Sequence, residues 1–439
     1  SGILSFISDI SGFLIFTITQ FILIPKIIEN VGDSAFGLWL SLVAFFGMLG
    51  LIELGSNQLI LTRSIRLIGS NKFILNRFIS ITLQIKIFLS ILIFLLGLII
   101  YIIFNDKFLI SNNMYIYYLI WSSLLVGVFG FFHSFISACG FLFVSNILNN
   151  IVLIFTYIVG FYLINLGLGI NALTYVQLFF GTLVTIFCII FSMHLSKERE
   201  IIFKFSRINF FYLKKLFFRS FEFAKINFSQ SIFAFADHLI IGFLLGAEYI
   251  VIYFISIRIS SLIAPNVTRV FSAIFPYYSW IYHHGSKADF KSLTILNLNY
   301  VLKLSIIGTL IFIFLYEKAL ILWMGEDYLI NDLFMYLLII TVFRDSLVKS
   351  LTQLLMATGE IRNISNVLMI EAILKIIFSI ILIYFYGIVG AIIAQVLSTA
   401  ILSPMITILS LKDLIRISVL EFFQILLKLF YKNNFFQII

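Results

Sequence analysis

Long apolar runs separated by short polar segments dominate the chain. A membrane-spanning helix needs about 20 mostly apolar residues, whereas the strands of an outer-membrane barrel are about half that length and alternate in polarity. The runs match the first pattern and lack the second. The sequence therefore predicts an all-α integral membrane protein with about 12 transmembrane helices, at 3–24, 35–55, 79–104, 115–137, 143–165, 171–194, 225–246, 249–277, 302–323, 332–356, 365–386 and 388–410.

A basic segment interrupts this series after the sixth run and predicts the domain organisation. It holds eight Lys or Arg residues between positions 195 and 225. We expect an N-terminal six-helix lobe at 1–194, a basic cytoplasmic linker at 195–224, a C-terminal six-helix lobe at 225–410 and a cytoplasmic or interfacial tail at 411–439.

The distribution of basic residues between loops predicts the orientation. Cytoplasmic loops of membrane proteins carry an excess of Lys and Arg. With twelve spans, twenty of the 29 basic residues fall on the side of both termini, including the loop expected at 63–77, and three fall on the other side. Both termini are therefore expected in the cytoplasm. The net charge of +9 reflects this topology, and no nucleic-acid partner is expected.

Composition excludes a soluble globular domain. The chain is 62% hydrophobic and 11% charged, with a mean hydropathy of +1.13, whereas soluble domains are about half apolar and a quarter charged. Cys139 and Cys188 lie in apolar runs, without a CxxC motif or a histidine at ligand spacing. No disulfide, metal site or cofactor is expected.

Two segments, one in each half of the chain, have a similar pattern. Gly32 is followed at a distance of seven residues by Trp39, and Gly246 is followed at the same distance by Tyr253. Each segment predicts a tight turn between two helices. Internal duplication is common in transporters, whose substrate site then lies between the repeats.

The same segments resemble a known family. Pro25 to Gly32, Phe36-Gly37-Leu38-Trp39 and Glu53-Leu54-Gly55 resemble the opening of polysaccharide flippases, although Glu53 stands where aspartate is commoner. The segment from Asp237 to Tyr253 resembles the seventh helix of those proteins. They belong to the superfamily of multidrug, oligosaccharidyl-lipid and polysaccharide exporters, and the topology matches over essentially the whole chain.

The resemblance implies a MATE-like fold of two six-helix lobes around a central cavity. It implies a multi-pass flippase of the bacterial cytoplasmic (inner) membrane, without enzymatic activity. Its substrate would be an undecaprenyl-pyrophosphate-linked oligosaccharide, moved from the inner to the outer leaflet for O-antigen or capsule synthesis. Membrane lipids, a polysaccharide polymerase and other assembly proteins are the partners expected for a monomeric transporter.

Charged residues inside the apolar runs are the candidate site. A charge at the bilayer centre costs about 2.5–3.5 kcal/mol on insertion scales, so such residues usually have a function. Arg258 and Arg269 are eleven residues apart, which on one continuous helix places them on one face about 16 Å apart; Pro265 between them would bend that helix. Arginine suits a pyrophosphate because its fork matches phosphate oxygens. The candidate substrate-binding residues are Arg258, Arg269, Arg344, Lys349, Lys375 and Arg63.

Structural roles remain open for several of these residues. Asp345–Lys349 and Glu371–Lys375 have the spacing of ion pairs along a helix, and Arg269, Arg63 or Lys86 could extend to the headgroups. Four acidic residues are candidates for ion coupling or for structural pairing: Asp237, Asp9, Glu53 and Glu371.

Two other function classes remain as alternatives. A drug/cation antiporter of the same superfamily would place acidic residues in its cavity, whereas cations prevail here. A membrane-embedded polysaccharide polymerase or glycosyltransferase would carry positioned carboxylates in large external loops; the longest expected here, 317–331, holds only Glu317, Glu326 and Asp327.

Overall fold

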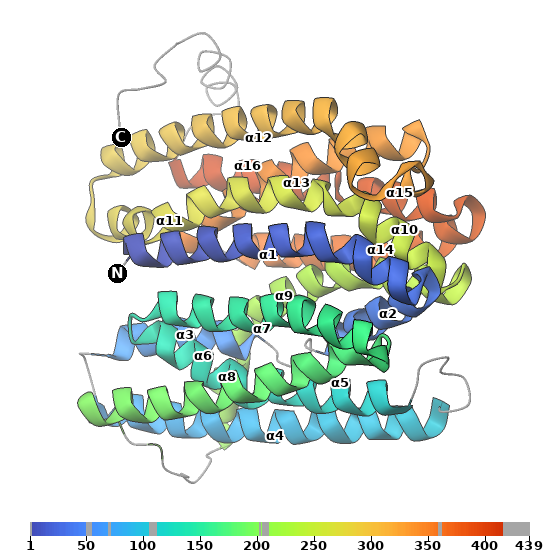
Figure 1. The fold of residues 1–439 in the computed structure, drawn as a ribbon. Coiled ribbons are helices and arrows are strands. Elements are labelled where there is room, and N and C mark those ends of the chain that lie inside the picture. Colours follow the sequence, from blue (N-terminus) through green and yellow to red (C-terminus); the bar gives the residue numbers. More distant parts are fainter. Residues whose placement is uncertain are drawn as a thin grey trace. The chain divides into compact units, whose positions relative to one another are not determined.

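The computed structural model describes residues 2–49, 55–68, 72–104, 112–201, 203, 210–358 and 362–415. All regular elements among these residues are helices (Figure 1). The longer ones are α1 (Gly2–Val31), α2 (Asp33–Leu49), α3 (Ser56–Leu67), α4 (Lys72–Phe104), α5 (Asn112–Leu124), α6 (Gly130–Ala138), α7 (Leu142–Leu163), α8 (Asn171–Glu198), α9 (Phe210–Leu244), α10 (Ala247–Arg258), α11 (Ile263–His284), α12 (Lys287–Met324), α13 (Asp332–Thr358), α14 (Arg362–Tyr386), α15 (Ile388–Thr399) and α16 (Leu402–Ile415).

The predicted all-helical membrane fold is confirmed. Each of the twelve predicted runs overlaps one or more of these helices. By length and composition, eight helical segments in the described residues could cross a membrane, or nine if α10 and the segment after it form one bent span. The apolar α2, at 17 residues, is too short to be counted among them. The chain is therefore a multi-pass membrane protein.

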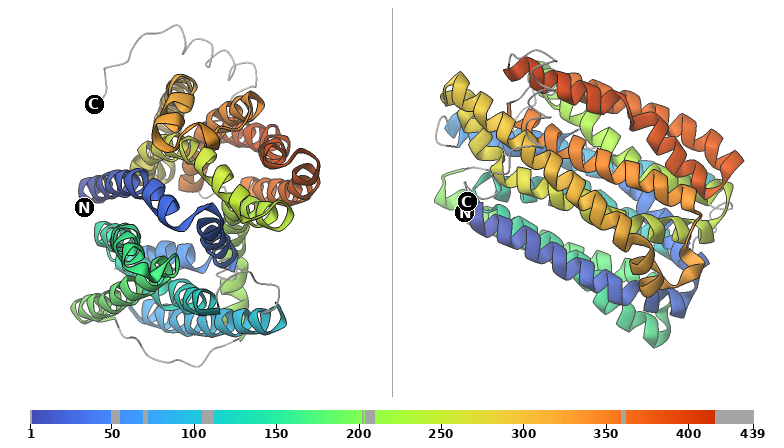
Figure 2. Two further views of the ribbon diagram at one scale, coloured as in Figure 1. Left: turned by 45° about the vertical axis from the view of Figure 1, so that its right-hand side comes forward. Right: turned by 90° about the horizontal axis from the view of Figure 1, so that it is seen from above.

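The chain divides into two compact units, Ser1–Val251 and Ile252–Ile439. In the first, α1 packs against α7, α7 and α5 pack against α8, and α9 packs against α2 and α3. In the second, α11 packs against α12 and α13, and α14 against α15 and α16. The long helices within each unit run side by side (Figure 2). The helix α9, assigned by sequence to the second lobe, thus packs in the first unit; the predicted lobe boundaries remain predictions.

Two loops expected from the sequence are helical instead. Residues 56–67, expected in a basic loop, form α3, and its Arg63 guanidinium lies 4.8 Å from the centre of the Phe78 ring on α4. The helix α12 begins at Lys287, fifteen residues before the predicted run, and is 38 residues long. At 1.5 Å per residue it measures about 57 Å, which exceeds the roughly 30 Å hydrocarbon core. Apolar runs therefore do not indicate polar helix ends that extend beyond the bilayer.

The predicted linker is also partly helical. The helix α8 continues to Glu198 and α9 begins at Phe210. After α8, Arg199 donates a hydrogen bond of 2.7 Å to the backbone carbonyl of Cys139. The ammonium of Lys72, at the start of α4, bonds to the exposed Glu200 carboxylate and lowers its pKa. Side-chain contacts thus join the ends of α8, α6 and α4.

The two similar sequence segments form equivalent turns. Gly32 separates α1 from α2 with φ of +81°, and Gly246 lies between α9 and α10 with φ of +121°. Glycine adopts positive φ without the steric cost that other residues meet. The aromatic residues that follow, Trp39 and Tyr253, are both buried. The predicted tight turns between helices are confirmed.

These two segments also contact each other within the first unit. A Cβ atom added to Gly37 of α2 would lie 1.9 Å from the backbone oxygen of Ala247, at the start of α10. Only glycine permits this approach, because a backbone atom cannot rotate away as a side chain can. Gly37, in the Phe36-Gly37-Leu38-Trp39 motif, therefore sets the distance between α2 and the start of α10.

We expect Gly37→Ala to destabilise the protein by about 1–3 kcal/mol, the usual cost of overpacking. The free energy of unfolding in a graded dodecyl sulfate titration measures this effect. The matched control is Gly47→Ala, also on α2, because an added Cβ there would meet the ring atoms of Phe235 rather than backbone. Equal losses in the two variants would contradict the role assigned to the backbone contact.

Candidate functional site: charged residues in the helices of each unit

A network of charged side chains joins α13, α14 and α16 in the second unit. Arg344 lies near the middle of α13, and its guanidinium contacts Asp345 at 2.7 Å and Glu371 of α14 at 3.0 Å. It also donates a hydrogen bond to the Ser403 hydroxyl of α16. Glu371 is 0% exposed. One guanidinium thus crosslinks three helices through planar, multidentate contacts of the kind that arginine makes best.

The second oxygen of Glu371 accepts a hydrogen bond of 2.7 Å from the backbone N–H of Ser403. Ser403 is the second residue of α16, and the first N–H groups of a helix have no partner inside that helix. The positive end of the helix dipole also favours a carboxylate at this position. Glu371 therefore caps α16 from a neighbouring helix while it pairs with Arg344.

Lys349 completes the network from the next turn of α13. Its ammonium lies 2.7 Å from the Asp345 carboxylate, so the predicted i, i+4 pair is present. Arg344, Lys349, Asp345 and Glu371 together carry two positive and two negative charges. The two cations are thus compensated by neighbouring carboxylates, which supports the structural role that the sequence left open. Their contact with substrate remains a prediction.

Arg258 and Arg269 do not share one helix, contrary to the expectation of a three-turn ladder. Arg258 is the last residue of α10 and Arg269 lies within α11. The two helical segments meet at a bend of 46°. Pro265, in the first turn of α11, has no N–H to continue the hydrogen bonds of α10, which is the physical reason for the break. The eleven-residue spacing therefore no longer places the two side chains on one face by itself.

Each of these arginines has a local contact. The guanidinium carbon of Arg258 lies 5.8 Å from the centre of the Phe254 ring, within the range of a cation–π interaction. Arg269 donates a hydrogen bond of 3.0 Å to the side-chain oxygen of Asn266. Both residues are partly buried. Their assignment to a substrate path remains a prediction.

The remaining candidates are distributed over several helices. Lys375 lies one turn after Glu371 on α14 and is fully buried, as is Lys86 on α4. Asp237 is buried on α9. Asp9 lies on α1, and Glu53 is outside the described residues, as is the tail beyond Ile415. The choice between ion coupling and structural pairing stays open for these acidic residues.

Ser403 is the member of the network that the sequence analysis did not identify. The predicted run at 388–410 is one candidate membrane span, but its helix is interrupted between Thr399, the end of α15, and Leu402, the start of α16. The available signal was the Ser403-Pro404 dipeptide, because proline in the first turn marks a helix start. The unpaired N–H groups at the start of α16 can bind a carboxylate. Glu371, on the preceding predicted run, was a candidate for that carboxylate.

Cys139 and Cys188 are buried and free of disulfides. Among the residues that the structure describes, no group of three or more His, Cys, Asp or Glu side chains is arranged to hold a metal ion.

No protein-family model matches the chain, and neither does any curated protein. Solved structures do share its fold. The lipid II flippase MurJ, in an inward closed conformation, is 17% identical with a TM-score of 0.67 over 97% of this chain and 94% of that one. An inward-facing MATE-family multidrug resistance transporter of the MOP superfamily is 11% identical with a TM-score of 0.63, over 95% and 96% of the two chains.

A third structure with this fold is a MOP-superfamily transporter from Pyrococcus furiosus, 13% identical with a TM-score of 0.62 over 95% of each chain. Its reported binding pocket has reverse polarity, which suggests a different function for that protein. At such low identities, these similarities establish the fold. The chain has the fold shared by MurJ and MATE transporters, as the sequence predicted.

Proposed function

We propose that this protein is a flippase that moves an undecaprenyl-pyrophosphate-linked oligosaccharide from the inner to the outer leaflet, for synthesis of O-antigen or capsule. The observation that carries the proposal is the match of nearly the whole chain to the fold of the lipid II flippase. The proposed location is the bacterial cytoplasmic membrane, with both termini in the cytoplasm, in agreement with the distribution of basic residues.

The charges in the helices suit this substrate. A pyrophosphate loses its hydration on entering a membrane, and fixed cations offset that cost. Arg258 and Arg269 are the proposed phosphate contacts, because both lie in the bent pair of apolar helical segments formed by α10 and α11, and the guanidinium fork matches phosphate oxygens. The prenyl tail of the substrate would remain in the bilayer during transport.

The test is deletion of the gene in its own host. We expect the lipid-linked repeat unit to accumulate on the cytoplasmic leaflet and surface polysaccharide to be lost, with both restored by the wild-type gene. Purified protein in liposomes should accelerate the translocation of a fluorescent lipid-linked oligosaccharide. Normal surface polysaccharide in the deletion strain would refute the proposal.

The second candidate is a drug/cation antiporter, favoured by the similar match to MATE transporters. The buried Asp237 is the residue on which an antiporter could depend. Sodium- or proton-dependent dye efflux from vesicles, abolished by Asp237→Asn, would favour this function. Lipid-linked oligosaccharide translocation that survives in Asp237→Asn, without dye efflux in wild type, would favour the flippase.

A further inference from the structure

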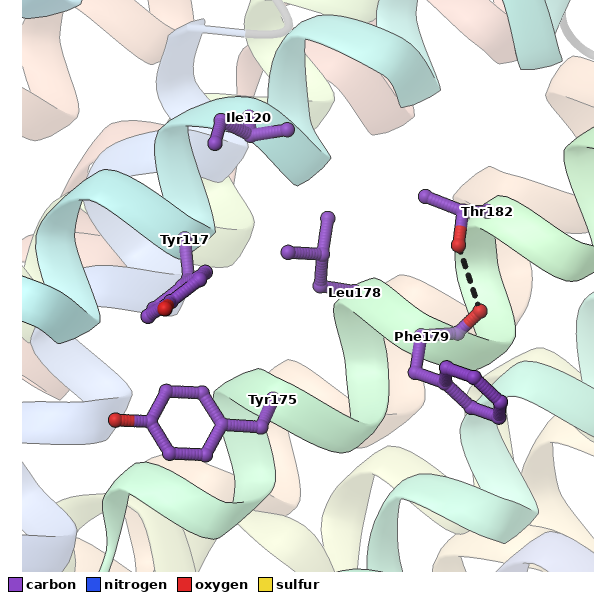
Figure 3. A pocket seen from close by; sticks show the side chains of 6 residues that line it. All are labelled: Tyr117, Ile120, Tyr175, Leu178, Phe179 and Thr182. Carbon is purple, nitrogen blue, oxygen red and sulfur yellow. Dashed lines mark hydrogen bonds between the residues drawn. The ribbon is translucent and has the colours of Figure 1, made fainter.

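An apolar groove lies between α5 and α8 in the first unit (Figure 3). It has a volume of about 440 Å³. Its walls are six side chains, two from α5 and four from α8: Tyr117, Ile120, Tyr175, Leu178, Phe179 and Thr182. Both helices belong to segments apolar and long enough to cross a membrane. The groove is therefore part of the membrane-embedded portion of the protein.

The side chains that line the groove offer water few hydrogen-bonding partners. The Thr182 hydroxyl donates a hydrogen bond of 2.8 Å to the carbonyl of Phe179 on its own helix (Figure 3). The Tyr117 and Tyr175 hydroxyls are the other side-chain polar groups in the lining. A buried water needs two to four polar partners, and apolar cavities stay dry. The groove thus favours hydrocarbon as its content.

The two tyrosines close one end of the groove. Their rings meet edge to face, with centroids 4.9 Å apart. Both lie in the second turn of their helices, since α5 begins at Asn112 and α8 at Asn171. Tyrosine concentrates at the level of the lipid headgroups. From Tyr175 to Thr182 the groove then extends about 10 Å along α8, in the direction of the bilayer centre.

The groove is continuous with the exposed apolar face of α8. Phe179 is 58% exposed, and exposed apolar residues continue at helical spacing with Leu183, Ile186 and Ile190. Behind the groove, the helices pack closely, because Gly181 leaves room for the Trp121 ring. The opening therefore faces away from the helix contact, onto a surface that is apolar along most of α8.

We propose that this groove binds one acyl chain of a bilayer phospholipid, with the headgroup near Tyr117 and Tyr175 and the chain directed along Leu178 and Thr182. The groove is lined by membrane-spanning helices, is apolar along its length and has phenolic groups at one end, as this ligand requires. The site is independent of the substrate proposed above, because it uses none of the charged residues.

The test uses the full chain in liposomes of phosphatidylethanolamine and phosphatidylglycerol that contain a phospholipid with a diazirine near the end of one acyl chain. After illumination, adducts are mapped by peptide mass spectrometry. We expect at least fivefold more adducts at 178–182 than around Leu95, which is exposed on α4 and lies nine residues from Phe104 at the end of that helix, as 178–182 lie seven to eleven residues from the start of α8. Equal labelling of the two regions would overturn the proposal without any variant.

Filling the groove gives a second, matched comparison. Ile120→Trp should lower the groove adducts at least fivefold, whereas Ile190→Trp, the same change on the exposed face, should leave them unchanged. Equal labelling in Ile120→Trp and wild type would overturn the proposal. Displacement of the adducts by a low fraction of polyprenyl phosphate would also overturn it, because the groove would then hold a prenyl tail. Crosslinks to a second copy of the chain in place of lipid adducts would refute it as well.

Discussion

Replacing Glu371 with alanine is expected to destabilise the protein by about 3–5 kcal/mol, the usual cost of removing one partner of a buried ion pair. The carboxylate is fully buried and accepts hydrogen bonds from Arg344 and from the N–H of Ser403. Without the carboxylate, the Arg344 guanidinium loses its ion-pair partner on α14, and the Ser403 N–H at the start of α16 loses its hydrogen-bond acceptor. A graded dodecyl sulfate titration of the purified protein measures the free energy of unfolding.

The control for this variant is Lys349→Gln. Its side chain is 51% exposed, and Asp345 keeps its contact with Arg344 when the lysine charge is removed. Exposed ion pairs contribute about 0–1 kcal/mol, so the control should lose no more than that. A loss in Glu371→Ala as small as in Lys349→Gln would contradict the assignment of Glu371 to a stabilising network.

The double variant Arg344→Met/Glu371→Gln separates stability from transport. It removes both charges, while the glutamine oxygen can still accept from Ser403. Replacing a buried pair as a whole is often neutral, so most of the stability lost in Glu371→Ala should return. If this variant also transports, Arg344 has no essential contact with substrate. A stable variant that no longer transports would instead support the predicted role of Arg344 in the substrate path.

The length of the apolar runs was sufficient to predict the membrane helices, because each spanning helix must be apolar over most of its length. It was insufficient where a helix breaks inside an apolar run. Pro265 and Pro404 both lie in the first turn of a helix that continues a predicted run. Composition hardly changes at such a break, so hydropathy does not reveal it, and the helical face of the residues after the break can no longer be read from spacing. For this reason the spacing of Arg258 and Arg269 does not define a ladder on one helix.

Pairing of charges was predictable only within a helix. Asp345 and Lys349 are four residues apart, so the helix itself brings them together. Arg344 and Glu371 are 27 positions apart and meet through the packing of α13 and α14, which a single sequence does not specify. Spacing along the chain named Lys375 as a partner for Glu371, whereas it could name no partner for an ion pair between helices.

Charge reversal at Arg258 or Arg269 is expected to abolish transport while leaving insertion intact. A carboxylate in place of a phosphate-binding guanidinium repels the pyrophosphate and removes hydrogen bonds of about 1.5–3 kcal/mol. Arg258→Lys keeps the positive charge but loses the bidentate geometry of the guanidinium. We expect the rate of translocation to fall about 10- to 100-fold, since each factor of ten corresponds to about 1.4 kcal/mol. The rate of translocation of a fluorescent lipid-linked oligosaccharide in liposomes measures both effects.

The matched control is Lys318→Glu, which makes the same change of charge at an exposed position of α12. It should transport at the wild-type rate, with all variants present in the membrane in equal amounts. Because the bend places Arg258 and Arg269 on different helices, the single variants need not be equivalent. Loss in only one would identify the phosphate contact, whereas full transport in both Arg258→Glu and Arg269→Glu would refute a cationic path through this part of the protein.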